Sequence, residues 1–313
     1  MSVDPYSALI TAVEPGEAKP GPLSGKRLLV KDLIDTAGIR TTYGSRIYGD
    51  HVPERTAPAV TKLLDAGAVL VGKSNLPEFA WAVMGQNPFY GTVHNPVAPG
   101  KTTGGSSSGN AAGLAADLCD IALGTDTGCS IRLPSACCET VGLLRQPPMV
   151  GDGRETEPSE LAEGWAVDLE RLGARVVEAR VPEPSASTWP VFNHEALESH
   201  RATFPSRAAE YSDVCRTKLE SAQKTTPAEV EAAYRAVEEW RRFEPDVDLY
   251  VAPCYTQELP AEDADELEVR LRFSEFLRWV NLIGWAGLAI GNLQLIAPYD
   301  GTVLAAGLAL VRG

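Results

Sequence analysis

The sequence predicts an α/β fold, because short apolar strands alternate with a helical segment in its first half. Residues 27–30 form an apolar run that ends at Lys31, and residues 67–72 form a second run bounded by glycines. Between them, residues 57–64 carry apolar side chains at helical spacing. A strand, a helix and a second strand in this order are the repeating unit of an α/β sheet.

The same signals predict the elements that follow. Residues 85–108 are rich in Gly, Pro, Asn, Ser and Thr and predict a long irregular loop, which in a compact domain usually serves function. A capping box formed by Thr226 and Glu229 marks the start of the clearest helix. The pattern predicts helices over 110–118, 160–172 and 227–243, strands over 120–124, 174–181 and 246–253, and a helix or irregular segment from Ile131.

Composition excludes several classes of function. The 313 residues carry 28 Lys and Arg against 42 Asp and Glu, and a net charge of −14 argues against direct binding of nucleic acid. No stretch approaches the roughly 20 apolar residues that span a bilayer, and no basic segment followed by an apolar run stands near the N-terminus, so we expect no membrane partner and a cytoplasmic protein. The six Cys lack Cys-x-x-Cys spacing and are predicted to be buried thiols.

A glycine- and serine-rich run at residues 104–109, followed by Ser130, is the most informative segment. Glycines beside serines let the backbone approach a reacting group closely. A phosphate-binding loop is excluded because Asn110, and not Lys, follows Gly109. None of the four His stands beside a Gly-x-Ser-x-Gly motif, and no carboxylate or His cluster has the spacing of metal ligands, so we expect no catalytic metal.

A lysine remains as the base. Lys31 ends an apolar strand, where partial burial would lower its pKa and leave part of it neutral. A neutral lysine can take a proton from a serine hydroxyl, and a second serine can relay that proton.

Taken together, these segments resemble the amidase signature family, serine hydrolases of linear amides with a Ser, Ser, Lys triad. The resemblance covers most of residues 25–143 and implies a mixed central β-sheet covered by helices on both faces, with no cofactor. The motifs that carry it are Lys31-Asp32-Leu33, residues 41–45, residues 72–79, Asn95-Pro96, the 104–109 run and residues 124–134.

The resemblance also implies roles for individual residues. Ser130 matches the nucleophile that forms an acyl-enzyme, Ser106 matches the bridging serine after a cis Gly105–Ser106 peptide, and Lys31 matches the general base. The backbone N–H groups of Thr127, Gly128, Cys129 and Ser130 match the oxyanion hole, and Ser107, Asp126 and Arg132 match supporting positions.

Cys129 departs from the family, which usually has Gly at this position. If the position requires positive φ, a Cβ costs on the order of 1 kcal/mol and tilts an oxyanion donor. Buried packing and a redox-sensitive thiol are both open for Cys129. Trp81, Met84 and Gln86 stand where the family often places substrate-facing residues, and core packing is the alternative for Trp81 and Met84.

Comparison with the family also predicts an internal shortening after about residue 143, and a second one near Gly291. The fold is therefore expected to be incomplete, with one wall of the substrate pocket missing. Acidic residues are concentrated beyond residue 150, and we interpret that change as a junction within one α/β domain spanning 1–313. Within it we expect a catalytic core at 25–143 and a peripheral and C-terminal layer at 160–313.

Three functions follow from this interpretation. The first is hydrolysis of a linear carboxylic amide to an acid plus ammonia or an amine. The second is a catalytically impaired homologue that acts as a binding protein, and the third is the amidase subunit of a transamidating complex. The expected partner is a small-molecule amide, whose identity the sequence leaves open, as it does the oligomeric state, a homo-oligomer included.

Overall fold

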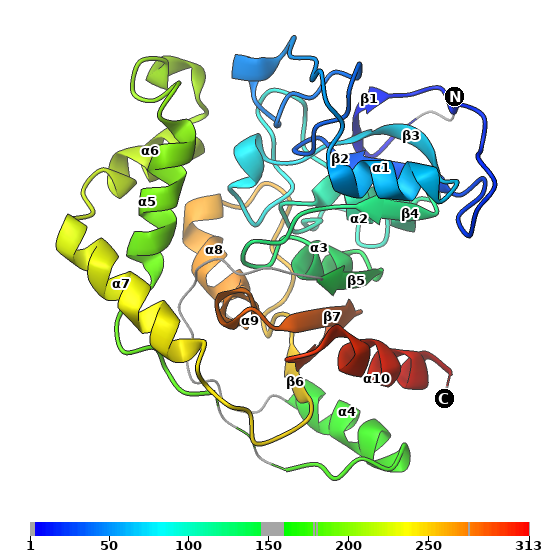
Figure 1. Cartoon of the computed structure of the whole chain (residues 1–313), viewed down its shortest axis with the longest axis vertical. Helices are drawn as coiled ribbons and strands as arrows, with labels where there is room; N and C mark the ends of the chain where they lie inside the picture. Colours follow the sequence, from blue (N-terminus) through cyan, green and yellow to red (C-terminus); the bar gives the residue numbers. More distant parts are fainter. Residues whose placement is uncertain (1–3, 145–159, 178, 180, 275, 313) are drawn as a thin grey trace.

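A computed structural model describes residues 4–144 and 160–312 apart from residues 178, 180 and 275, and its described strands form two four-stranded sheets (Figure 1). The first sheet contains, in spatial order, β1 (Leu9–Ala12), β3 (Val69–Ser74), β2 (Arg27–Lys31) and β4 (Ile121–Leu123). The second contains β5 (Val141–Leu144), β7 (Ala286–Ile290), β8 (Leu293–Ala297) and β6 (Tyr250–Pro253).

Strand direction differs between the two sheets. In the first, β2 runs parallel to both β3 and β4, whereas β1 is antiparallel to β3. In the second, every pair is antiparallel. The α/β class and the mixed sheet are therefore confirmed, but the strands divide between two sheets.

Helices α1 (Pro58–Asp65) and α2 (Ser108–Ala115) cover opposite faces of the first sheet. Leu28 and Val30 of β2 share an apolar cluster with Val60 of α1. Leu29, the residue between them, points to the other face, where its side chain meets Gly113 of α2. The alternation along β2 thus fixes one helix on each side.

The second sheet is also covered on both faces, by α3 (Arg132–Cys137) and α10 (Asp300–Arg312). Gly287 of β7 lies against the Arg132 side chain, whereas the neighbouring Leu288 meets Gly307 of α10. Helix α3 directly follows the segment 124–131, so its packing connects the second sheet to the first half of the chain.

Helices α5, α6 and α7 form a separate layer, to the left of the sheets in Figure 1, with α8 and α9 between it and the second sheet. In this layer α5 packs on both α6 and α7. The capping box predicted at Thr226 and Glu229 is present. The bounds are α4 (Glu160–Arg171), which lies by β6, then α5 (Trp189–His200), α6 (Asp213–Ala222), α7 (Pro227–Trp240), α8 (Glu266–Phe273) and α9 (Arg278–Ile283), with 3₁₀ turns η1 (Arg46–Tyr48), η2 (Glu78–Ala80) and η3 (Ala208–Glu210).

Most predicted elements are confirmed, and one is wrong. Residues 174–177, 179 and 181 form no strand. Val176 and Val177 are both exposed, so the alternating pattern there neither buries a face nor pairs with a neighbouring strand. The junction interpreted from the change in charge near residue 150 lies within residues 145–159, outside the described residues.

The second predicted shortening, near Gly291, falls in the hairpin between β7 and β8. Gly291 occupies its turn with φ +53°, a conformation that glycine adopts without strain. The internal shortening itself stays a prediction. Strand β5 is an edge of the second sheet, and its Val141 is largely exposed.

All six Cys are free and buried, as predicted. Among the described residues, no helix has both the length and the apolar character needed to cross a bilayer.

Two glycines in helices are expected to respond oppositely to alanine. A Cβ at Gly109 of α2 would lie 2.3 Å from the Ala8 carbonyl oxygen and 2.6 Å from the Asn75 nitrogen, both backbone atoms. We expect Gly109→Ala to lower the free energy of unfolding by about 2 kcal/mol. Gly301 of α10 has nothing within 4 Å of such a Cβ, so Gly301→Ala should leave stability unchanged or raise it slightly. Urea denaturation measures both, and equal losses would contradict this packing.

Candidate active site

The site lies where parallel strands end. Strand β2 ends at Lys31, which pairs in register with Ser74 of β3, and Val30 pairs with Leu123, the last residue of β4. The loop of residues 124–131 therefore starts beside Lys31. Ligand sites of α/β sheets typically form at this edge, outside the carboxyl ends of the strands.

Lys31 is fully buried, and its amine makes hydrogen bonds to hydroxyl groups. Its Nζ lies 2.8 Å from Ser106 Oγ and 2.9 Å from Thr125 Oγ1. Burial lowers the pKa of Lys31 to about 7, although the negative charge of Asp126 acts in the opposite direction. Near neutral pH this amine is therefore divided between its charged and neutral forms.

Ser106 and Ser130 are brought together through the backbone. The Gly105–Ser106 peptide is cis, as the resemblance implies. The Ser107 N–H donates to the Ser130 carbonyl oxygen at 3.0 Å, and Ser107 Oγ donates to the Thr125 carbonyl at 3.3 Å. Ser130 is half-buried, and its hydroxyl makes no hydrogen bond to any described residue.

Four consecutive N–H groups stand next to that hydroxyl without a partner. Within the described part of the chain, the amides of residues 127–130 donate to no acceptor, whereas the next two, of Ile131 and Arg132, donate to Asp126 Oδ2 at 3.0 and 3.2 Å. A run of free amides of this kind binds negative charge. The site can therefore receive an oxyanion.

Cys129 sits in this run without the strain that its Cβ would bring at positive φ. The backbone of Cys129 does not adopt the left-handed conformation with positive φ. Its side chain is buried in an apolar cluster with Leu133 and Phe273, and burial raises the pKa of its thiol to about 12. This environment favours packing over thiolate chemistry.

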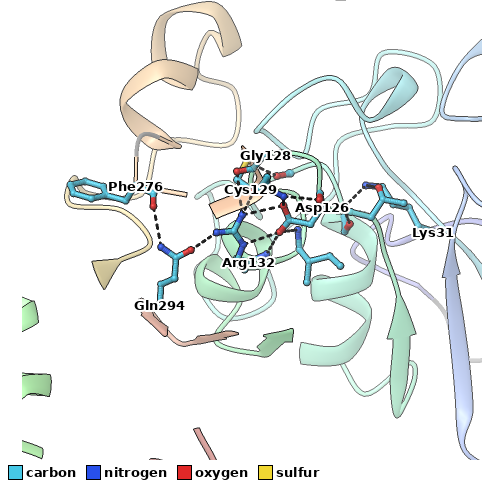
Figure 2. A network of polar contacts seen from close by, with 12 residues as sticks. Lys31, Asp126, Gly128, Cys129, Arg132, Phe276 and Gln294 are labelled. Atoms are coloured by element: carbon cyan, nitrogen blue, oxygen red, sulfur yellow. Dashed lines mark hydrogen bonds and ion pairs between the residues drawn. The ribbon is translucent and has the colours of Figure 1, made fainter. Parts of the chain in front are cut away.

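A buried ion pair holds the loop in shape (Figure 2). Arg132 Nε lies 3.1 Å from Asp126 Oδ2, and both side chains are inaccessible to solvent. Burial alone would raise the pKa of Asp126, but the charge of Arg132 and the hydrogen bonds to the carboxylate outweigh it and hold that pKa below its usual range. Arg132 also donates to the Gly128 carbonyl oxygen at 3.3 Å, inside the run of free amides.

Two amide side chains from the second half of the chain complete this network. Arg132 donates to Asn281 Oδ1 of α9 and to Gln294 Oε1 of β8. Asn281 Nδ2 donates in turn to the Asp126 carbonyl and carboxylate oxygens at 2.8 and 3.0 Å. The sequence patterns indicated no role for these two residues.

A second buried pair braces the strand ends. Lys73 Nζ lies 3.4 Å from Asp32 Oδ1 and donates to Thr41 Oγ1 at 2.6 Å, while Asp32 Oδ2 accepts from Thr42. Asp32 directly follows Lys31, so this pair fixes the backbone that carries the buried amine.

A small pocket of about 90 Å³ opens at Ser130. Its apolar wall includes Trp81 and Phe192, whose rings are 5.3 Å apart. Of the other substrate-facing candidates, Met84 is buried in the core, and Gln86 donates to two backbone carbonyls at 2.9 Å. The pocket is lined by residues 80–83 and 127–130 and by Trp189, Phe192, Lys218, Glu266, Arg270 and Arg278.

The fold and the site define an α/β protein with a buried lysine–serine pair beside a half-buried serine. Residues 3–151 match the family model described as Amidase. This match places residues 3–151, nearly half of the chain, in the amidase signature family.

Curated relatives support this assignment over part of their length. A glutamyl-tRNA(Gln) amidotransferase subunit of Haloarcula marismortui is 46% identical over 138 residues, which are 44% of this chain and 32% of that protein. The same subunit of Methanospirillum hungatei is 46% identical over 216 residues, 69% of this chain and 48% of that protein. The chain spans about a third to a half of the length of these relatives.

Solved structures share the fold. A crystal structure described as an amidase has a TM-score of 0.79 and 25% identity, covering 93% of this chain and 85% of that one. An allophanate hydrolase of Kluyveromyces lactis has a TM-score of 0.81 at 20% identity, over 99% of this chain and 67% of that one, and shows the fold alone.

Removing the guanidinium of Arg132 should strongly destabilise the protein. Arg132→Met leaves the Asp126 carboxylate buried without its partner, and we expect the free energy of unfolding to fall by about 3–5 kcal/mol. As a control, Arg171→Met removes an exposed arginine paired with Asp168 and should change stability by less than about 0.5 kcal/mol.

The pH dependence separates this ion pair from simple packing. Because Arg132 keeps the pKa of Asp126 low, its contribution is present above about pH 4 and is lost as the pH falls further. The stability gap between wild type and Arg132→Met should therefore narrow as the pH falls below about 4, measured by denaturation between about pH 6 and pH 2.5. A gap independent of pH, or one as small as for Arg171→Met, would contradict this role.

Proposed function

We propose that this chain hydrolyses a linear carboxylic amide to an acid plus ammonia or an amine, through an acyl-enzyme on Ser130. One observation carries the proposal: a fully buried lysine with a pKa of about 7 lies 2.8 Å from Ser106 Oγ, on the segment that is bonded to Ser130. The membership of the amidase family supports the same reaction class.

The first half of the reaction forms the ester. Neutral Lys31 accepts the Ser106 proton, Ser106 Oγ accepts the Ser130 proton, and Ser130 Oγ bonds to the amide carbon. The carbonyl oxygen becomes an oxyanion, which the free amides of residues 127–130 receive. An oxyanion donor of this kind typically contributes about 3 kcal/mol to stabilising the transition state.

The second half releases the products. The proton on Lys31 returns through Ser106 to the amide nitrogen, the C–N bond breaks, and ammonia or an amine leaves. A water molecule then adds to the acyl carbon, gives its proton to the same relay, and the acid departs while Ser130 regains its hydrogen. No step requires a metal or a cofactor.

A second candidate function follows from the relatives. Several are subunits of an amidotransferase, so this chain is also a candidate for the amidase subunit of a transamidating complex. In that case a partner protein would be needed, and hydrolysis of glutamine should depend on adding that partner. Turnover of free amides by the isolated chain distinguishes the first function from the second.

The nucleophile can be identified by covalent labelling. A fluorophosphonate should label wild type at Ser130, and Ser130→Ala should lose both the label and amide turnover. As a control, Ser199→Ala removes an exposed hydroxyl that donates to the Glu195 carbonyl of the same helix, and it should behave as wild type. Labelling or turnover that survives in Ser130→Ala would exclude the acyl-enzyme, and an unlabelled wild type would favour a catalytically impaired binding protein.

The base can be identified from the pH dependence of turnover. Because burial lowers the pKa of Lys31 to about 7, kcat/KM should rise as the pH increases through 7, where the amine becomes neutral, and then level off. Lys31→Ala should reduce kcat/KM by about 10²-fold or more and lose this midpoint. The exposed Lys62→Ala should retain it. A wild-type profile that is flat between pH 5.5 and 9 would refute Lys31 as the base.

A further inference from the structure

The wall of the Ser130 pocket collects positive charge in an acidic protein. Lys218, Arg270 and Arg278 line it with a single carboxylate, Glu266, although the whole chain has a net charge of −14. Cations gathered in a pocket of low dielectric attract anions more strongly than scattered surface charges do. The question is which of these cations is available to a ligand.

Lys218 is already neutralised. Its Nζ lies 3.1 Å from Glu266 Oε1 and 2.5 Å from the Trp81 carbonyl oxygen, and both charged side chains are buried. Glu266 also accepts from the Val83 N–H at 3.1 Å. This pair anchors the 80–83 segment of the pocket wall.

Arg278 is also held within the protein. Its Nε donates to Ser274 Oγ at 2.9 Å, it donates to the Arg270 carbonyl at 3.2 Å, and its guanidinium lies 4.4 Å from the centre of the Trp189 ring. It adds charge to the wall from a fixed position.

Arg270 differs from both. It is half-buried, yet its guanidinium makes no hydrogen bond or ion pair with any described residue, and its contact is with the Trp189 ring, at 5.8 Å. Burial lowers the pKa of Arg270, a sign that its charge is poorly solvated there. A guanidinium removed from water without an acceptor is unfavourable unless a ligand supplies one.

We propose that Arg270 binds a carboxylate at the far end of the acyl portion of the substrate, so that the chain prefers monoamides of short dicarboxylic acids. Ser130 and Arg270 line one pocket of about 90 Å³, which suits a short acyl chain with a reacting group at one end and an anion at the other. Trp81 and Phe192 offer an apolar wall for its methylene groups. This inference rests on the proposed function and deepens it.

Matched substrates test the preference. Succinamate and glutaramate carry the carboxylate, and butanamide and pentanamide carry a methyl group in its place. We expect wild type to show higher kcat/KM for the two anionic amides. Arg270→Gln should lower kcat/KM for these about 10- to 100-fold and leave the neutral amides within about 2-fold, whereas Arg270→Lys should retain part of the preference.

The same helix offers a control. Arg272, two residues further along α8, is exposed and does not line the pocket, so Arg272→Gln should leave both substrate classes unchanged. An equal loss in Arg270→Gln and Arg272→Gln would point to a general effect of surface charge and would overturn the inference, as would an anionic-to-neutral ratio that Arg270→Gln leaves unchanged.

A binding measurement separates this inference from the proposed reaction. Calorimetry with succinate and the full-length Ser130→Ala variant should show binding that weakens about 10-fold or more when Arg270→Gln is added. If Ser130 is never acylated but succinate still binds through Arg270, the reaction is wrong and the anion site stands. If neutral amides are hydrolysed and Arg270→Gln leaves the affinity for succinate unchanged, the reaction stands and the anion site is wrong.

Discussion

The buried ion pair between Asp126 and Arg132 is the interaction on which the candidate site depends. Asp126 Oδ2 accepts from the amides of residues 131 and 132 as well as from the guanidinium, so this one oxygen holds the turn of the chain into α3. The amides of 127–130 then have no acceptor among the described residues, and these four residues line the pocket. A buried pair of this kind is costly to desolvate and gives little net stability. Its value here lies in the shape that it imposes.

Two fully buried lysines show how burial produces different chemistry at neighbouring strand ends. Burial lowers the pKa of both Lys31 and Lys73. Lys73 has a carboxylate within 3.4 Å, which offsets that cost and makes an internal brace. The hydrogen-bond partners of Lys31 are hydroxyl and carbonyl oxygens, which leave its amine free to exchange a proton. The hydrogen-bond partners, and not the exposure, thus distinguish the internal brace Lys73 from Lys31, the lysine proposed as the base.

Sequence patterns predicted what local signals determine. These signals were sufficient to predict strand β2, the capped helix α7 and the contact of Lys31 with Ser106, because apolar runs, capping residues and ordered motifs mark them. The hydrogen-bond partners of Arg132 could not be predicted from the sequence. Asn281 is 149 positions away and reaches Arg132 only because β7 and α9 pack on α3. Nor could the environment of Arg270 be predicted, because the lack of a hydrogen-bond acceptor for it among the described residues depends on the three-dimensional structure. The strand expected at 174–181 is the opposite case. Apolar and polar residues alternate there as in a strand, but the described residues of this segment pair with no neighbouring strand.

The reach of Arg132 into β8 and α9 has a consequence for how the gene could be divided or recombined. A fragment ending at residue 144 would contain Lys31, Ser106 and Ser130 and still lack the two amide side chains that hold Arg132 in place. Such a fragment would need its complement in trans to form the loop. A chimera that exchanged the second half for a homologous one would depend on keeping an amide at both positions, however well the new half folded by itself.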